Sequence, residues 1–407
     1  MIRQRYIGRQ TTIIAVVAAW LSAAPVLAQQ SDDEGGFQAN VGLIFDFNDN
    51  IFDSSTEEIE SWIARISPDL LLSSTPGKRQ FSAQYVGDYG KFFDSPDDDY
   101  QDHSLTGRGL FKMGSRGALD VSAVFARGHD ARGSGQTRGV PPDSPAFPPE
   151  PDVFDRIDWA AQYTHGGTGA RGRLEFAIGQ NDLEYTNNLD RTQFFNRDDS
   201  FAYAGLTIGL RERTSFVVEA RYTRYDYAVD RPGDASLDGD DRRFLVGVTW
   251  DATARTEGSV RVGMQRRSFD DPNRTGTGDR TPSWDVAVRW SPRQHSYFDF
   301  ATSRANEETI AGRSFVDRSS YGISWTHEWP IGLESVLSWD RRKDDFVGSS
   351  SNRKEDASET YFGLRLPQGE RVVWEAGVRS RSRTSTIESL EYDGMLYTIG
   401  VNFQLTR

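Results

Sequence analysis

The sequence of 407 residues contains no cysteine, four methionines, five histidines and a single long apolar run. Without cysteine, the chain has no disulfide, no thiolate nucleophile and no thiolate metal ligand. The histidines are scattered, and neither an HExxH nor a GxSxG motif occurs. We therefore expect a protein that is not an enzyme and that has no catalytic, cofactor-binding or metal-ligating residues.

The apolar run lies at the N-terminus. Three arginines within the first nine residues precede it, the run itself covers 11–21, and the segment VLA ends at Ala28. This order is typical of a secretory signal peptide that is cleaved after Ala28. A membrane-anchoring helix is the alternative, but the run is short for crossing about 30 Å of hydrocarbon. The expected parts are a signal peptide at 1–28, a short polar periplasmic lead at 29–36 and one domain at 37–407.

The rest of the chain has no other long apolar run, and the full sequence has a net charge of −13 and a mean hydropathy of −0.61. The acidic balance and the dispersed basic residues argue against nucleic acid as a partner. An exported chain of this composition is either soluble or a β-barrel, because the spanning strands of a barrel alternate and escape hydropathy averages.

Alternation favours the barrel. From Phe37 to the C-terminus, apolar and polar residues alternate in stretches of about ten residues, which predicts about 18 strands. Short connections such as GSRG (114–117) and PQGE (367–370) alternate with long ones such as 130–154 and 229–240. Outer-membrane barrels place short turns in the periplasm and long loops outside. Both ends of the domain are therefore expected on the periplasmic side.

A soluble β-sandwich or propeller would also contain many short strands. However, tryptophans gather at strand ends, as at Trp250, Trp290 and Trp329, and aromatic belts at the membrane interfaces are typical of barrels. The predicted fold is therefore all-β, a transmembrane antiparallel β-barrel in the outer membrane of a Gram-negative bacterium.

The period of two also assigns an inner face. Apolar residues such as Val260, Val262 and Met264 would face lipid, so the charged residues between them point inward. An arginine facing lipid at mid-membrane would cost about 2–4 kcal/mol. The candidate lumen-lining residues are Arg65, Asp69, Asp88, Arg108, Asp120, Asp158, Arg173, Glu175, Glu219, Arg221, Arg261, Asp285, Arg289, Asp299, Glu334, Asp340, Glu359, Arg365, Glu375 and Arg379.

Two interpretations of these charges stay open. They form ion-pair ladders that stiffen the wall, or they line a passage for a polar solute. Acidic groups outnumber basic ones in the set, so a neutral or hydrated solute fits better than an anion.

Two kinds of loop carry further hypotheses. The proline-rich segment 130–154 lies over the mouth or folds into the lumen, or it is a surface loop without a gating role, which is the favoured interpretation. The acidic runs DSPDDD (94–99) and DGDD (238–241) are candidates for a divalent cation, but they lack EF-hand spacing and solvated loops are favoured.

Three early segments carry a family resemblance: VGLIFDFNDNIF (41–52), ISPDLLLSS (66–74) and FSAQYVGDYGKF (81–92). A strand ending in Asp-Asn, a strand with a Pro-x-Leu segment and a tyrosine-containing strand resemble the putative β-barrel porin 2 family. The resemblance implies a barrel of similar strand number and a role in export of exopolysaccharide or capsule. Outer-membrane lipid and lipopolysaccharide are the expected partners, and the resemblance adds polysaccharide cargo and periplasmic export components.

Three functions therefore remain. The resemblance implies a pore that assists exopolysaccharide export, with Tyr203, Tyr225 and Tyr361 as inward stacking faces. A general or substrate-selective diffusion porin for small polar solutes is the second. A plugged structural or adhesive surface barrel is the third.

Overall fold

The chain forms one closed antiparallel sheet. The computed structural model describes residues 35–167, 170–250, 255–274, 278, 280–308, 315–348 and 352–406. The expected signal peptide at 1–28 and most of the expected polar lead lie outside the described residues.

Within the described residues there are 18 strands, as the alternation predicted. The first nine are β1 (Gly36–Asn48), β2 (Ser61–Ser73), β3 (Arg79–Phe92), β4 (Tyr100–Met113), β5 (Gly117–Asp130), β6 (Asp152–His165), β7 (Gly172–Tyr185), β8 (Arg197–Arg211) and β9 (Thr214–Tyr227). The others are β10 (Gly239–Trp250), β11 (Thr256–Phe269), β12 (Arg280–Arg293), β13 (Ser296–Glu308), β14 (Phe315–Glu328), β15 (Glu334–Val347), β16 (Lys354–Gln368), β17 (Val372–Ser385) and β18 (Tyr392–Gln404).

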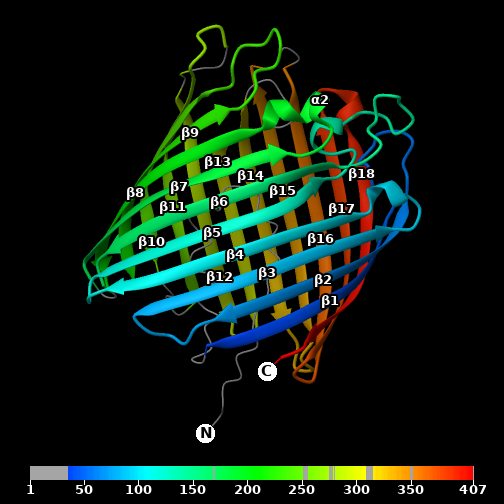
Figure 1. The fold of residues 1–407 in the computed structure, drawn as a ribbon. Helices are drawn as coiled ribbons and strands as arrows, with labels where there is room; N and C mark the ends of the chain where they lie inside the picture. Colours follow the sequence, from blue (N-terminus) through cyan, green and yellow to red (C-terminus); the bar gives the residue numbers. More distant parts are fainter. Residues whose placement is uncertain are drawn as a thin grey trace.

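Each strand pairs with the next along the chain, and β1 also pairs with β18, which closes the barrel. The strands are inclined and wrap around a central space, as Figure 1 shows. Closure leaves no strand edge with unpaired backbone groups, which a bilayer requires because its core offers no water to satisfy them.

The connections separate by length. Short turns lie at the lower rim in Figure 1, where β1 begins and β18 ends, and the long connections lie at the upper rim. Glycine makes two of the tight turns possible: Gly332 and Gly369 have φ of 81° and 70°, in the left-handed region that other residues adopt at a cost. This arrangement agrees with the expected one, in which short turns and both ends of the domain share the periplasmic side.

Short helical segments occur only in upper-rim connections among the described residues: η1 (Pro96–Asp98), η2 (Gly135–Thr137), α2 (Leu189–Thr192), η3 (Gln193–Phe195) and η4 (Glu388–Leu390). No helix in the described part of the chain is long and apolar enough to cross a membrane.

The strands have 12 to 15 residues, as the ranges above show. A tilted strand needs about 9–11 residues to span a bilayer, so the extra residues extend the wall beyond the hydrocarbon. Large apolar side chains stand exposed on one face, for example Phe45 and Ile66, each 50% exposed. Exposed apolar residues on alternate positions of every wall segment are what a lipid-facing surface requires.

Candidate functional site: the charged inner wall

Strand register separates the two faces of the wall. Residues directly opposite each other on neighbouring strands share a face. Leu43 pairs with Ile66 on the exposed apolar face, and the next pair, Ile44 with Arg65, therefore lies on the inner face. Following the alternation along each strand and the register from strand to strand around the barrel places all twenty candidate residues on the inner face.

The candidates on the first five strands illustrate how the inner charges are arranged. The Arg65 guanidinium lies 3.3 Å from a carboxylate oxygen of Asp46 on β1 and 2.7 Å from one of Asp88 on β3. Arg108 on β4 forms a forked pair with Asp120 on β5. The contacts of Arg65 connect β1, β2 and β3, and the pair of Arg108 connects β4 and β5. Both therefore link neighbouring strands on the inner face.

The same arrangement continues along the second half. Arg261 on β11 reaches Glu219 on β9 at 2.9 Å and Asp285 on β12 at 2.6 Å. Arg289 on β12 and Asp299 on β13 are 2.7 Å apart. Further contacts of the candidates are Arg365 with Glu375 (3.3 Å), Arg379 with Glu359 (3.2 Å), Arg173 with Glu175 (3.5 Å), Asp158 with Arg156 (3.1 Å) and Asp69 with Gln84 (2.8 Å).

Most inner charges are therefore neutralised by a neighbour, which supports the ion-pair interpretation of the sequence. Arg221 is different. It has no carboxylate partner among the described residues and lies over the Phe201 ring at 4.7 Å. Directly opposite it on β10 stands Arg243, which donates hydrogen bonds to the Ser283 hydroxyl (2.8 Å) and to the Trp284 carbonyl (3.2 Å).

Two acidic candidates complete the set. Asp340 on β15 is exposed on the inner face and has no ion pair among the residues described. Glu334 begins the same strand, opposite Arg365 on β16. The wall is therefore not uniformly neutral: β9 and β10 carry two arginines side by side, and β15 carries a free carboxylate.

The loop at 131–151 crosses the upper mouth. Its Arg138 lies 3.4 Å from Glu355 on β16, which is seven strands from β5 around the wall. Gly139 packs against the β17–β18 connection, where an added Cβ would approach the Leu390 side chain to 2.6 Å. These contacts support the alternative in which the segment lies over the mouth, and whether it has a gating role stays a hypothesis.

The base of this loop is held by Arg132. Its guanidinium lies 2.6 Å from Asp98 in the β3–β4 connection and stands over the rings of Phe52 and Phe147 at 5.1 and 5.4 Å. The hydrogen bond to Asp98 raises the pKa of Arg132 further above its ordinary value, so the clamp is charged at every physiological pH. Asp98 belongs to the DSPDDD run, and Asp99 of the same run pairs with Lys91 at 2.6 Å.

The two acidic runs therefore serve as ion-pair partners and wall residues. Asp241 of the DGDD run is buried and accepts a hydrogen bond from Gln265 at 3.0 Å. Across the described ranges, no group of three or more His, Asp or Glu side chains is placed to hold a metal ion. The solvated-loop interpretation was also incomplete, since Asp98 and Asp241 are both buried.

A second cluster on the inner face was missed from the sequence. Arg267 on β11 is 1% exposed and pairs with Glu308 of β13 at 2.9 Å, and the Tyr227 hydroxyl donates to the same carboxylate. The cluster lies at the upper ends of the strands. Continuing the period of two to these ends would have included Arg267. It would not have included Glu308, which lies beyond Arg304, the last residue of β13 that pairs with β12.

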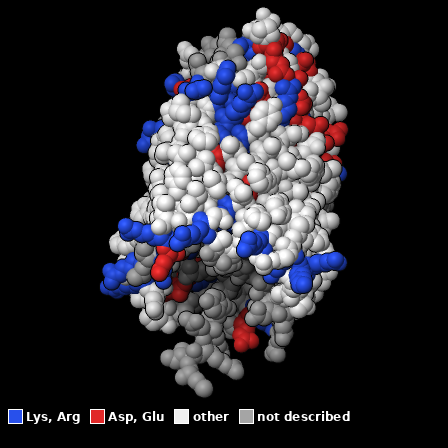
Figure 2. Space-filling model, turned by 90° about the vertical axis from the view of Figure 1, so that its left-hand side faces the viewer, with Lys and Arg blue, Asp and Glu red and all other residues white. Residues whose placement is uncertain are grey.

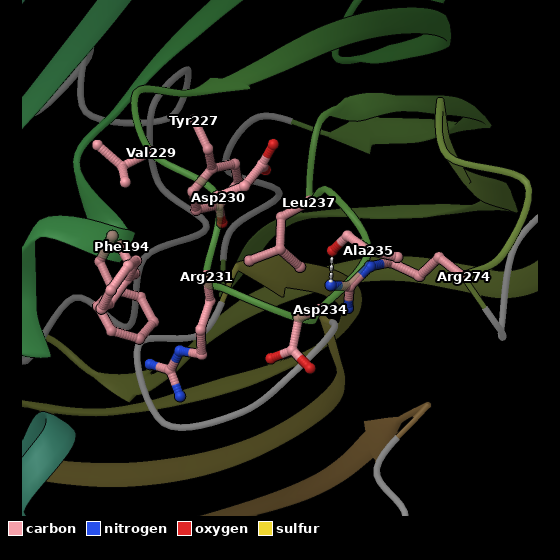
Figure 3. Close-up of a pocket in the computed structure, with 10 residues that line it drawn as sticks. Phe194, Tyr227, Val229, Asp230, Arg231, Asp234, Ala235, Leu237 and Arg274 are labelled. Carbon is pink, nitrogen blue, oxygen red and sulfur yellow. Dashed lines mark hydrogen bonds between the residues drawn. The ribbon is translucent and has the colours of Figure 1, made fainter.

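Three upper-rim connections pack beside this cluster around a small pocket (Figure 3). Arg231 lies over the rings of Phe194 and Phe195 at 5.2 and 5.6 Å, and Arg274 donates to the carbonyls of Ala235 and Ser236. The pocket holds about 20 Å³, enough for one water molecule. It is part of how the loops pack and is too small for a solute.

Taken together, a closed barrel with an apolar outer band, a charged inner wall and a loop across its mouth defines a porin of the outer membrane. The chain belongs to the Putative beta-barrel porin 2 family, whose profile matches residues 161–405. The match lies beyond the three early segments that carried the resemblance, so it supports the family from a different part of the chain. Porins are not enzymes, and the protein resides in the outer membrane of a Gram-negative bacterium.

Solved porin structures share the fold. The structure of Pseudomonas aeruginosa OccK2 (OpdF) in complex with glucuronate is 11% identical, with a TM-score of 0.52; 92% of this chain and 100% of that chain are covered. A BenF-like porin from Pseudomonas fluorescens Pf-5 is 10% identical, with a TM-score of 0.51 and the same coverage. A search among curated proteins finds no match.

Proposed function

We propose that the protein is a diffusion porin for small polar solutes. The observation that carries this proposal is loop 131–151, which crosses the mouth of a barrel whose inner wall is charged and largely neutralised by ion pairs. Removing water from ionised side chains costs free energy, so we expect a charged inner wall to be hydrated. A loop held across the opening by ion pairs narrows the entrance to this proposed passage.

The neutralised wall also bears on which solutes pass. An arginine held by one or two carboxylates offers hydrogen bonds to a passing solute but little net charge. Twelve of the twenty candidates are acidic and eight are basic. Hydrated neutral molecules and small cations therefore suit the passage better than anions, except beside Arg221 and Arg243.

Exopolysaccharide export, which the family resemblance implies, has less support. A polymer chain needs an open and continuous passage, and the clamp of loop 131–151 by Arg132 and Arg138 reduces the opening. The inward tyrosines offered as stacking faces contribute little, since Tyr225 is covered by Arg267 at 4.1 Å from its ring.

Liposome swelling tests the proposal. Vesicles containing the purified protein should swell rapidly in isotonic solutions of small neutral sugars and progressively more slowly as the sugar becomes larger. Swelling with short oligosaccharides as fast as with monosaccharides would favour a polymer pore. No swelling with any solute would favour the plugged, structural barrel.

A further inference from the structure

Three arginines form a row on the outer face of the barrel: Arg242 on β10, Arg266 on β11 and Arg280 on β12. The register places Arg242 directly opposite Arg266, and Arg266 directly opposite Arg280. By the alternation along the strands, they lie on the same face as Phe244 and Met264, which are 50% and 43% exposed on the lipid-facing side. All three arginines are exposed, and they belong to strands that start or end at the upper rim.

Figure 2 shows this side of the molecule, with basic side chains gathered above a broad uncharged band. The band follows from the register. The pairs next to the row are Phe244 with Met264 and Met264 with Pro282, followed by Val246 with Val262. The row therefore marks the upper edge of the apolar surface, at the depth where the headgroups of the outer leaflet begin.

Like charges directly opposite on neighbouring strands destabilise a sheet unless something compensates them. Arg242 has a compensating group, since Asp240 on its own strand lies 3.0 Å from its Nε atom. Arg266 and Arg280 have no ion pair or hydrogen bond of their side chains within the described part of the chain. Two adjacent cations thus stand at the membrane edge without an acidic partner.

Carboxylates near the row lie further from the membrane. Asp240 is two residue pairs closer to the loops than Arg242, and Asp226 and Asp270 lie beyond the row, both bound to Arg224 at 2.8 and 2.6 Å. The order from the membrane outward is therefore apolar surface, arginine row, acidic groups. An anion that approaches from the lipid side meets the arginines first.

Other outward arginines near this rim are neutralised within the protein. Arg304 on β13 lies 2.6 Å from Asp317, and Arg341 on β15 lies 2.6 Å from Asp356. The uncompensated row is thus a local feature of β10–β12 and not a general property of the rim.

We propose that Arg242, Arg266 and Arg280 bind the phosphate groups of a phosphorylated glycolipid of the outer leaflet. The planar guanidinium matches phosphate oxygens in a two-pronged geometry, and neighbouring arginines can share one phosphate or hold two. The acyl chains of that lipid would lie along the apolar band directly below. The site depends on the outer-membrane location and not on what passes through the lumen.

The test measures retention of bisphosphorylated lipid A by the purified full-length protein in detergent, by native mass spectrometry. The double variant Arg266→Gln/Arg280→Gln is compared with the matched double variant Arg304→Gln/Arg341→Gln, which removes the same charge from ion-paired positions. Each basic residue near an anionic lipid surface contributes about fivefold in affinity, so the first variant should bind roughly 25-fold more weakly. The second should bind nearly as well as the unaltered protein.

Three results would overturn the proposal. These are an equal loss in both double variants, unchanged binding in the first, or retention of dephosphorylated lipid A as strong as that of the bisphosphorylated form. Displacement of lipid A by millimolar inorganic phosphate would show a free-anion site instead. Heat-modifiable mobility on gels verifies folding, and if the double variant does not fold, Arg266→Gln alone should bind about fivefold more weakly.

Discussion

Arg65 is the cation on which the inner wall of β1–β3 depends. It serves Asp46, whose side chain is only 3% exposed, as well as Asp88. Asp46 also accepts a hydrogen bond from the Thr398 hydroxyl at 2.5 Å across the closing strands β1 and β18. Replacing Arg65 by alanine leaves a buried carboxylate without its cation, and breaking such a pair typically costs about 3 kcal/mol or more.

Arg65→Ala should therefore lower the free energy of unfolding by about 3 kcal/mol, measured by denaturant unfolding in detergent micelles. The control is Arg289→Ala. Its partner Asp299 is 35% exposed and Arg289 itself 37%, so solvent screens the pair and the loss should stay within about 1 kcal/mol. Equal effects of the two substitutions would show that burial of Asp46 is not what matters.

Arg221 and Arg243 set the electrostatics of one sector of the lumen. Removing both charges in Arg221→Gln/Arg243→Gln should shift the permeability ratio toward cations, because the carboxylates around them then act alone. One unit charge at contact distance in water is worth about 1 kcal/mol, so a change of about fivefold is expected from reversal potentials in a salt gradient. The neutral double change Arg289→Gln/Asp299→Asn should leave the reversal potential where it was.

For single residues, the sequence predicted which face of the wall each charged side chain occupies, but not which residue it pairs with. A period of two placed twenty charges on the inner face. It could not show that Arg261 would bind Glu219 two strands away, which happens because the intervening inner position on β10 is Gly247, with no side chain in the way. Ion pairs of this kind depend on the register between neighbouring strands, and the sequence of one strand does not determine that register.

Among the elements, loop 131–151 is the one most directly tied to passage. Arg132→Gln/Arg138→Gln removes both of its ion pairs with the wall and neighbouring loop. The loop should then move more freely, and single-channel recordings should show larger conductance with more frequent fluctuations. The control is Arg231→Gln, an upper-rim arginine that lies over the rings of Phe194 and Phe195 and has no ion pair among the described residues, and it should leave the recordings unchanged.

The strands themselves were predicted well because lipid enforces alternation along their middle parts. The errors lie at the upper ends, where the wall leaves the hydrocarbon and polar residues occupy both faces. β6 begins at Asp152 and β13 continues to Glu308, each a few residues beyond the alternating stretch. The position of the loop could not be predicted for a related reason: its prolines indicated an extended chain, but nothing in the sequence showed that Arg138 would contact Glu355.

For the molecule as a whole, we propose that the 18-stranded barrel encloses a narrow, water-filled passage. The closed topology and the family follow from β1–β18 pairing and from the profile match at 161–405. The passage is part of the proposed function, and the charged inner wall and the position of loop 131–151 at the mouth support it.

The most direct measurement is single-channel conductance of the purified protein in a planar lipid bilayer. A diffusion porin should give discrete, ohmic current steps in molar KCl, with a weak preference for cations that follows from the excess of carboxylates on the inner wall. A correctly folded protein that inserts and conducts no current would show that the barrel is plugged and that it is not a diffusion porin.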